Sequence, residues 1–205
     1  MSNVQRSIVL DVHALAGAYF APISLQLGAG EMLCLFGASG SGKSQFLRAL
    51  VDLELHQGAV FLQDVEQQQM LANLWRRKVA YLPAESGWWA VRVGQHFATQ
   101  PSSDALASLG LEEAILAREV DGISSGERQR LGLLRLLVQR PQVILLDEPS
   151  ANLDPDSTLK MEQVIRAYLH EAQAAAIWVS HDPLQRERIA DRSMEMPLMQ
   201  REGAA

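Results

Sequence analysis

Apolar and polar residues alternate over residues 8–13, and a period of two is typical of a β-strand with one buried face. Further along the first half of the chain, short apolar runs bounded by glycine or proline predict more strands. The turn Gly28-Ala29-Gly30 precedes one of these runs, and Pro83 ends another. The strands expected in this half cover residues 8–13, 23–27, 32–36, 59–62 and 79–82.

In the second half, continuous apolar runs are separated by helical patterns. The runs at 143–146 and 176–180 do not alternate, which suits parallel strands covered on both faces. Between them, Asp154-Pro155 offers a helix N-cap followed by proline at the first helical position, and apolar residues recur at helical spacing over 161–169. Strands that alternate with helices predict an α/β fold, with a mostly parallel sheet and helices on both faces.

The middle of the chain has a different pattern. Tryptophan, polar residues and short helical patterns between residues 85 and 116 predict an inserted helical subdomain. The sequence Ser124-Ser125-Gly126-Glu127 follows, with the S-x-x-E form of a capping box ahead of an apolar run. Ser124 is therefore expected to cap a helix that ends before Pro141, and the Glu127 side chain is expected to reach back to the cap.

The strongest chemical signal follows the apolar run 32–36. Residues 37–44 read Gly-Ala-Ser-Gly-Ser-Gly-Lys-Ser and fit the pattern G-x-x-x-x-G-K-[ST] at every fixed position. The glycines let successive backbone N–H groups turn inward to form an anion site, and the following helix adds the positive end of its dipole. Lys43 is expected to reach the β and γ phosphates, and the Ser44 hydroxyl to hold Mg²⁺. The strand before the loop and the helical spacing after it argue against a chance match.

The composition of the chain restricts the number of domains, the partners and the location that can be expected. A length of 205 residues suits one domain, and a formal net charge of −6 leaves no basic footprint, so no nucleic-acid partner is expected. The single cysteine, Cys34, lies in an apolar run and is expected to be a buried core residue. The charge-free run 14–30 is too broken to span a membrane, so the chain is expected to be cytoplasmic. The final Gly203-Ala204-Ala205 is expected to fray.

Three chemically distinctive stretches each follow an apolar strand. They are the phosphate loop 37–44, the pair Asp147-Glu148 and His181. Ligands of parallel sheets bind beyond the carboxyl ends of the strands, so one sheet edge is expected to collect this chemistry. Taken singly, each has a plainer interpretation, since Asp147-Glu148 also suits an acidic turn and a lone histidine is usually a hydrogen-bonded polar residue.

The order of the motifs resembles that of the ATP-binding cassette (ABC) ATPases, in the form of the small single-cassette subunits of transporters. The residues that carry the resemblance cover nearly the whole chain. After the phosphate loop come Tyr81-Leu82-Pro83-Ala84-Glu85 at the place of the Q-loop, residues 123–130 as the signature loop, Asp147-Glu148-Pro149 as the Walker B end, residues 150–154 as the D-loop and Ser180-His181-Asp182 as the switch histidine.

The resemblance implies the fold and the domain organisation. We expect a P-loop NTPase (RecA-like) fold, with a mostly parallel sheet flanked by helices, an N-terminal antiparallel β part and a small inserted helical subdomain. The chain would be a single nucleotide-binding domain, 1–205. Residues 1–83 and 135–205 would form the catalytic core, and residues 84–134 the helical subdomain with the signature loop.

The resemblance also implies site residues and cofactors, ATP and Mg²⁺. Glu148 would orient and deprotonate the attacking water, His181 would stabilise the γ phosphate, and Lys43 would share in catalysis. Ser44 and Asp147 would hold Mg²⁺. The implied nucleotide-binding residues are Gly37, Ala38, Ser39, Gly40, Ser41, Gly42, Lys43, Ser44, Gln45 and, against the adenine, Tyr19. In the family two cassettes enclose ATP head to tail, so Ser124, Ser125, Gly126 and Glu127 would face the nucleotide of the opposite protomer.

Three positions depart from the family pattern. Ala84 stands where the Q-loop glutamine belongs, so Glu85 or water would replace it at the metal, or the coupling step is weakened, or the loop is shifted by one residue. Ser125 stands where the signature usually has glycine. The adenine-stacking aromatic is imperfectly spaced, and Tyr19 is chosen over Phe20 and His13.

The expected function is that of an ATP-binding and ATP-hydrolysing subunit of an ABC transporter. It would dimerise around two Mg-ATP, as a homodimer or pseudo-dimer, and drive a separate membrane-spanning permease from the cytoplasmic face of the cell membrane. Trp88 and Trp89 would either anchor that partner or pack inside the helical subdomain. Two rivals remain: a soluble ABC ATPase of chromosome maintenance, repair or translation, and a regulatory nucleotide-binding module with little turnover, favoured by Ala84 and Ser125.

Overall fold

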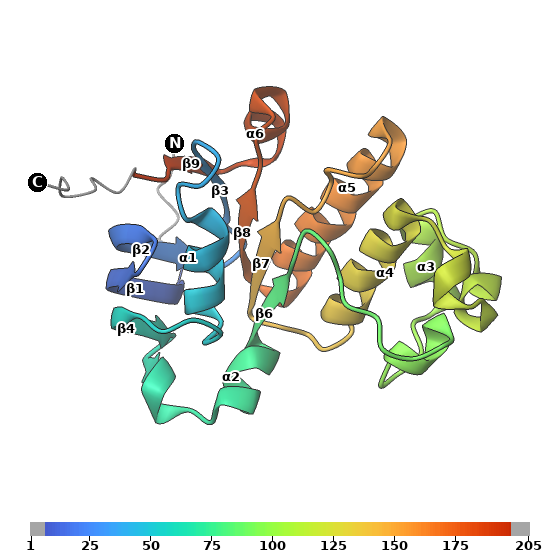
Figure 1. Cartoon of the computed structure of the whole chain (residues 1–205), viewed down its shortest axis with the longest axis horizontal. Helices are drawn as coiled ribbons and strands as arrows, with labels where there is room; N and C mark the ends of the chain where they lie inside the picture. Colours follow the sequence, from blue (N-terminus) through green and yellow to red (C-terminus); the bar gives the residue numbers. More distant parts are fainter. Residues whose placement is uncertain (1–6, 198–205) are drawn as a thin grey trace, which may run out of the picture.

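A five-stranded parallel sheet with the order β6-β7-β8-β3-β9 forms the centre of the structure, a computed structural model that describes residues 7–197 (Figure 1). Each pair of neighbours in it runs parallel, as the continuous apolar runs predict. The fraying expected at residues 203–205 concerns positions outside the described range. The strands of this sheet are β3 (Met32–Phe36), β6 (Val79–Leu82), β7 (Val143–Asp147), β8 (Ala175–Val179) and β9 (Arg192–Glu195).

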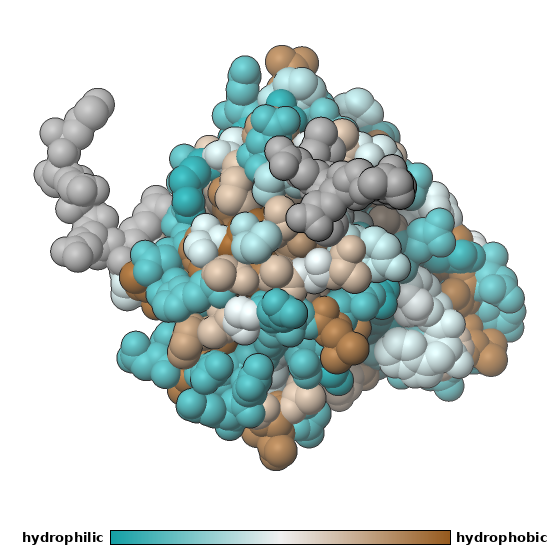
Figure 2. Space-filling view, turned by 60° about the vertical axis from the view of Figure 1, so that its left-hand side comes forward, coloured by the Kyte–Doolittle hydropathy of each residue, from teal (hydrophilic) through white to brown (hydrophobic). Residues whose placement is uncertain are grey.

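A second, antiparallel sheet has the order β2-β1-β4-β5 and lies on the side of α1 (Figure 1). Its pairs are all antiparallel, as expected for the N-terminal β part. Figure 2 looks towards this side of the molecule, where hydrophilic side chains surround small, separate apolar groups. The strands are β1 (Ile8–Gly17), β2 (Phe20–Gly28), β4 (Gln57–Leu62) and β5 (Val65–Glu66).

Helices complete the fold, and apart from one isolated strand-like bridge the described chain between β6 and β7 forms only helices and loops. The predicted inserted segment is therefore helical, although the division at residues 84 and 134 remains a prediction and α4 crosses the second boundary. The α-helices are α1 (Lys43–Leu50), α2 (Ala72–Lys78), α3 (Ser103–Ser108), α4 (Ser125–Leu137), α5 (Pro155–Ala172) and α6 (Pro183–Ile189). Short 3₁₀ helices are η1 (Gln67–Gln69), η2 (Val93–His96), η3 (Glu113–Ala117) and η4 (Val120–Gly122).

The core has two parts, one on each face of the parallel sheet. Successive strand residues point to opposite faces, so Leu33 and Leu35 join α1 and the antiparallel sheet, whereas Ile144 and Leu146 join α4 and α5. Each fully buried side chain of this size contributes about 1.5–3 kcal/mol. Helices on both faces are thus confirmed, and Cys34 is buried as expected. Within residues 7–197, no helix combines the length and the apolar character that crossing a lipid bilayer requires.

Candidate active site

The sheet order places the three chemically distinctive stretches side by side. β7, β8 and β3 are consecutive neighbours, and all three are parallel, so their carboxyl ends share one edge. The loop 37–44 follows β3, Asp147 ends β7, and His181 lies just beyond β8. The expectation that one sheet edge collects this chemistry is therefore confirmed by the topology.

The phosphate loop ends in a glycine that no other residue could replace. Gly42 is the N-cap of α1 with φ of 91°, in the left-handed region. A Cβ on it would lie 2.4 Å from the backbone oxygen of Tyr19. The loop can therefore turn into the helix only because this position lacks a side chain, and the turn between β1 and β2 packs directly against it.

The loop also holds polar groups with the chemistry of an anion site. Lys43 is 6% exposed, and its Nζ donates to the carbonyl oxygens of Gly37 at 3.0 Å and Ala38 at 2.9 Å. The Ser41 hydroxyl is buried and has no hydrogen-bond partner in the described part of the chain. A buried hydroxyl without a partner is costly, so the loop fits a phosphate group that would supply the missing contact.

Tyr19 lies in the turn that contacts the loop. Tyr19 is 65% exposed. Phe20, in contrast, is buried and packs edge-on against Phe46 of α1, with ring centroids 5.6 Å apart. His13 is 3.0 Å from Asp11 and packs beside Phe61 instead. Of the three aromatic candidates, Tyr19 alone combines exposure with a place beside the phosphate loop, which favours it as the adenine-stacking residue.

Asp147 is a buried carboxylate, and within residues 7–197 one side chain donates to it. It is 6% exposed, and the Tyr81 hydroxyl at the end of β6 donates to its Oδ2 at 2.8 Å. Burial, together with the charge of Asp147, raises the pKa of Tyr81, so the phenol remains a donor at neutral pH. Sequence reasoning missed Tyr81, because only the pairing of β6 with β7 brings it to the aspartate.

Glu148 and His181 contact each other across the sheet edge. His181 Nε2 lies 3.0 Å from Glu148 Oε1, and the two side chains are 48% and 38% exposed. Glu148 has φ of 49°, a left-handed conformation that costs a non-glycine residue of order 1 kcal/mol. A carboxylate held in that conformation, open to solvent and next to a histidine is placed to orient a water molecule.

The Q-loop position carries no metal-binding side chain of its own. Ala84 and Glu85 are both exposed, and within residues 7–197 no hydrogen bond or ion pair joins Glu85 to Ser44 or Asp147. No cluster of three or more His, Cys, Asp or Glu residues in the described chain could hold a metal ion by itself. A hydroxyl and a carboxylate at the sheet edge still suit Mg²⁺, which binds few protein oxygens and keeps water.

The predicted capping box is present at the start of α4. The Ser124 hydroxyl accepts from the Glu127 N–H at 3.1 Å, and the Ser124 N–H donates to Glu127 Oε2 at 2.7 Å. This backbone hydrogen bond, with a contribution from Arg118 3.1 Å away, lowers the pKa of Glu127. Ser124 is exposed, so the capped helix tip is open to another molecule.

Ser125 and Gly126 fit the first turn of α4 without strain. Ser125 starts the helix with an ordinary backbone and is absent from the described residues with positive φ, so the serine needs no glycine-like conformation. A Cβ on Gly126 would lie 3.2 Å from the Asn152 oxygen and 3.3 Å from Leu153. The signature loop therefore touches the D-loop of the same chain.

A single chain does not bring the signature loop to its own phosphate loop. In Figure 1, α1 and α4 lie on opposite sides of the parallel sheet, with the strands between them. The starts of α1 and α4 are thus separate within one molecule. A site built from both requires a second copy or a similar cassette.

Trp88 and Trp89 form a cluster with His96 and Arg135. The Arg135 guanidinium lies 4.8 Å from one indole ring and 4.9 Å from the other, and His96 packs edge-on against both. Trp88 packs against the helical core, whereas Trp89 is 74% exposed. The two tryptophans therefore have different surroundings, one suited to packing and the other to a partner. Burial lowers the pKa of Arg135.

Known proteins with similar sequences include several that are named import ATP-binding proteins. The family model described as "ABC transporter" matches residues 20–151. The phosphate import ATP-binding protein PstB of Aeropyrum pernix is 32% identical over 209 residues, 90% of this chain and 81% of that protein. The phosphonates import ATP-binding protein PhnC 1 of Rhodopseudomonas palustris is 33% identical over 186 residues, 78% of this chain and 68% of that protein.

Solved structures with the same fold include a dimeric, post-hydrolysis state of an ATP-binding cassette bound to ADP and Pi. It superimposes with a TM-score of 0.78 at 19% identity, over 91% of this chain and 94% of that one. A bacterial ABC exporter with ATP bound superimposes with a TM-score of 0.79 at 20% identity, over 96% of this chain and 38% of that one. These likenesses establish the fold.

Proposed function

Since the chain belongs to the ATP-binding cassette transporter family, we propose that its ATPase cycle works through a dimer that encloses two Mg-ATP and drives a membrane-spanning permease. The observation that carries the proposal is the separation of the phosphate loop from the signature helix tip. The phosphate loop and the start of α4 each offer donors to an anion, but within one chain they are too far apart to bind the same anion.

The roles of the residues follow from their positions. The N–H groups of the phosphate loop, Gln45 and Lys43 would bind the triphosphate, and Tyr19 would lie against the base. Ser44 and Asp147 would hold Mg²⁺, which when bound offsets the charge of the β and γ phosphates. Glu148 would accept a proton from the water that attacks the γ phosphate, while His181 keeps the carboxylate oriented and donates to a phosphate oxygen.

The second protomer would supply the remaining donors. Ser124, Ser125 and the Gly126 N–H lie at the exposed start of α4, where unpaired N–H groups and the helix dipole favour an anion. Glu127 would hold the Ser124 cap rather than face the phosphate, because its carboxylate is already bonded to that cap. Closure of the dimer would therefore assemble the catalyst from two chains.

The proposal includes the partner and its place in the cell. The relatives above are import subunits by name, and by analogy this chain would serve import through a separate permease on the cytoplasmic face of the cell membrane. Its cargo would be set by that permease and by any binding subunit. Trp89 and the neighbouring Arg135 would contribute to the surface that the permease contacts.

The decisive experiment compares wild type with Glu148→Gln, and with Glu187→Gln as a matched change at an exposed position of α6. Turnover should fall at least about a hundredfold in Glu148→Gln and remain unchanged in Glu187→Gln. With Mg-ATP, the Glu148→Gln protein should run as a dimer in light scattering.

Three results would contradict the proposal. Equal turnover in wild type and Glu148→Gln would favour a regulatory nucleotide-binding module. A Glu148→Gln protein that stays monomeric in saturating Mg-ATP would exclude the shared site. If the protein is purified from detergent-solubilised membranes and no protein with several membrane spans co-purifies with it, a soluble ABC ATPase would be favoured.

A further inference from the structure

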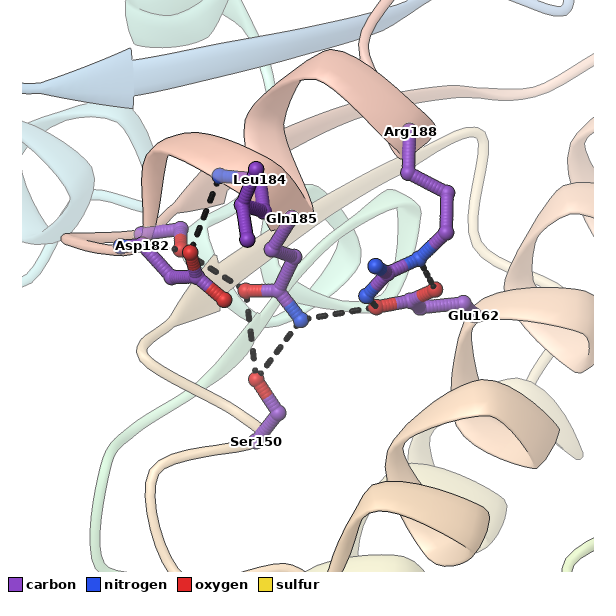
Figure 3. A network of polar contacts seen from close by, with 7 residues as sticks. Ser150, Glu162, Asp182, Leu184, Gln185 and Arg188 are labelled. Atoms are coloured by element: carbon purple, nitrogen blue, oxygen red, sulfur yellow. Dashed lines mark hydrogen bonds and ion pairs between the residues drawn. The ribbon is translucent and has the colours of Figure 1, made fainter.

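A second, buried contact joins the two loops that carry Glu148 and His181. Gln185 on α6 is 4% exposed, and its side-chain amide lies between the loop after β7 and the end of β8 (Figure 3). The Ser180 hydroxyl donates to Gln185 Oε1 at 2.7 Å, and Gln185 Nε2 donates to the Ser150 oxygen at 3.0 Å. Ser180 directly precedes His181, and Ser150 follows Glu148 by two residues. One side chain thus bridges both loops.

A buried carboxylate, paired with a partly exposed arginine, holds this amide in a defined orientation. Gln185 Nε2 also donates to Glu162 Oε1 on α5 at 2.8 Å (Figure 3). Glu162 is 6% exposed and accepts from two nitrogens of Arg188, both at 2.7 Å. An ionised carboxylate only accepts hydrogen bonds, so the amide nitrogen must face Glu162 and its oxygen must face Ser180. The two-point contact with Arg188 balances the buried charge.

We propose that Gln185 is a positioning residue for ATP hydrolysis, which sets the separation of the two loops and so aligns Glu148 with the attacking water. The inference rests on the proposed roles of Glu148 and His181. Their own contact is open to solvent, and such contacts constrain geometry weakly. The contacts of Gln185 with Ser180 and Glu162 are buried and its contact with Ser150 is partly buried, so they are less exposed to water than the Glu148–His181 contact, and they tie both loops to α5.

The position requires a group that donates on one side and accepts on the other. A carboxylate in place of the amide would put a second negative charge next to Glu162, with Arg188 as the cation that contacts the pair. Among the described residues, the other charged groups that line the same cavity as Gln185 are Asp182, whose charge acts on Arg188, and the Glu148–His181 pair. Repulsion between the carboxylates would raise the pKa of the new carboxyl group. Its protonated form, at low pH, would accept from Ser180 and donate its single proton to Glu162, while the Ser150 hydroxyl, 3.3 Å from Gln185 Oε1, would donate to it instead of accepting.

The test is the pH profile of Gln185→Glu in the full chain, with Gln163→Glu as the matched control at an exposed position of α5. At the acid end of the profile, kcat of Gln185→Glu should lie within about threefold of wild type, and it should fall about tenfold or more towards alkaline pH. KM and the nucleotide Kd should stay unchanged, because Gln185 does not contact the phosphate loop. Gln163→Glu should follow wild type throughout.

A second variant separates positioning from folding. Gln185→Leu removes both hydrogen-bonding groups, so its kcat should be low at every pH, and adding Ser150→Ala should lower it little further, since the two changes remove one contact. A Gln185→Glu profile parallel to wild type would overturn the proposal. So would a parallel loss of kcat, nucleotide affinity and melting temperature, which would indicate a purely structural role. Failure of the proposed function would appear separately, as wild-type turnover that Glu148→Gln does not reduce.

Discussion

The Tyr81 hydroxyl donates a 2.8 Å hydrogen bond to Oδ2 of Asp147 across the carboxyl ends of neighbouring parallel strands. In the register of β6 and β7, Tyr81 stands beside Leu145, so the tyrosine side chain reaches along the strand to the aspartate. One carboxylate oxygen of the proposed metal ligand is thus held by the protein. No side chain of residues 7–197 donates to the other oxygen, which under the proposed function would face the metal.

Tyr81→Phe should therefore weaken Mg²⁺ binding more than catalysis. The freed carboxylate can rotate, so the Mg²⁺ concentration for half-maximal turnover should rise several-fold while kcat at saturating Mg²⁺ changes little. Without metal, the variant should lose about 1 kcal/mol of unfolding free energy, as expected for a half-buried hydrogen bond. Titration of activity with Mg²⁺ and urea unfolding measure the two effects. An unchanged Mg²⁺ requirement would contradict the positioning role of Tyr81.

Glu85→Ala tests whether a side chain replaces the missing Q-loop glutamine. Glu85 is exposed, and among the residues that the structure describes no hydrogen bond or ion pair joins it to Ser44 or Asp147, so a role at the metal requires the loop to move when nucleotide binds. If it takes that role, the variant should need more Mg²⁺ for turnover, and Glu112→Gln, another exposed site, should not. Identical Mg²⁺ titrations in Glu85→Ala and wild type would leave water as the substitute.

The two tryptophans should respond differently to replacement. Trp89→Ala should abolish capture of the permease and leave the melting temperature almost unchanged, because its ring is largely exposed. Trp88→Ala should lower the unfolding free energy by about 2 kcal/mol, since its indole packs on the helical core. Leu55→Ala, at a 96% exposed side chain, is the control for loss of an exposed apolar group. If both tryptophan variants lost the same amount of unfolding free energy, the two residues would both have a structural role.

Glu127→Gln should destabilise the fold in a pH-dependent way. The folded-state pKa of Glu127 is lowered, first by the Ser124 N–H and then by Arg118, so its ionised form stabilises the fold. That contribution is present above the unfolded-state pKa of about 4.3 and is lost as pH falls through the lower folded-state value. The unfolding free energy of wild type should exceed that of the variant by about 1 kcal/mol at pH 7, and the difference should shrink as pH falls below the unfolded-state pKa and through the lower folded-state one. Urea unfolding at several pH values checks this, and a constant difference would refute it.

Features encoded in short stretches were predictable from the sequence. The phosphate loop, the capping box at Ser124 and the N-cap at Asp154 each depend on a few consecutive residues, and Asp154 does accept from the Ser157 N–H at 2.9 Å. The buried strands were predictable because their apolar runs have no polar interruption. The ends of the elements were harder to predict. The strand β1 continues to Gly17, because a bulge at Ala14, with φ of 46°, breaks the alternation on which the prediction relied.

Contacts between distant residues were not predictable. Gln185 and Glu162 are 23 residues apart and lie on different helices, and nothing in their local sequence indicates that they meet. The edge strand β9 was also missed, because it is mostly exposed and polar. So was α2, in which Trp75 is the buried residue and no apolar period is visible. In each case three-dimensional packing, not local pattern, determines the structure.

Lys43 has a consequence for how the protein meets its ligand. Its ammonium group is held by two neutral carbonyl oxygens, and no carboxylate in the described chain contacts it. An arriving anion therefore displaces no counter-charge, and the electrostatic attraction is not offset by the loss of an ion pair. The attraction between Lys43 and a bound anion should accordingly depend little on added salt, because a cation this deeply buried is screened much less than an exposed one.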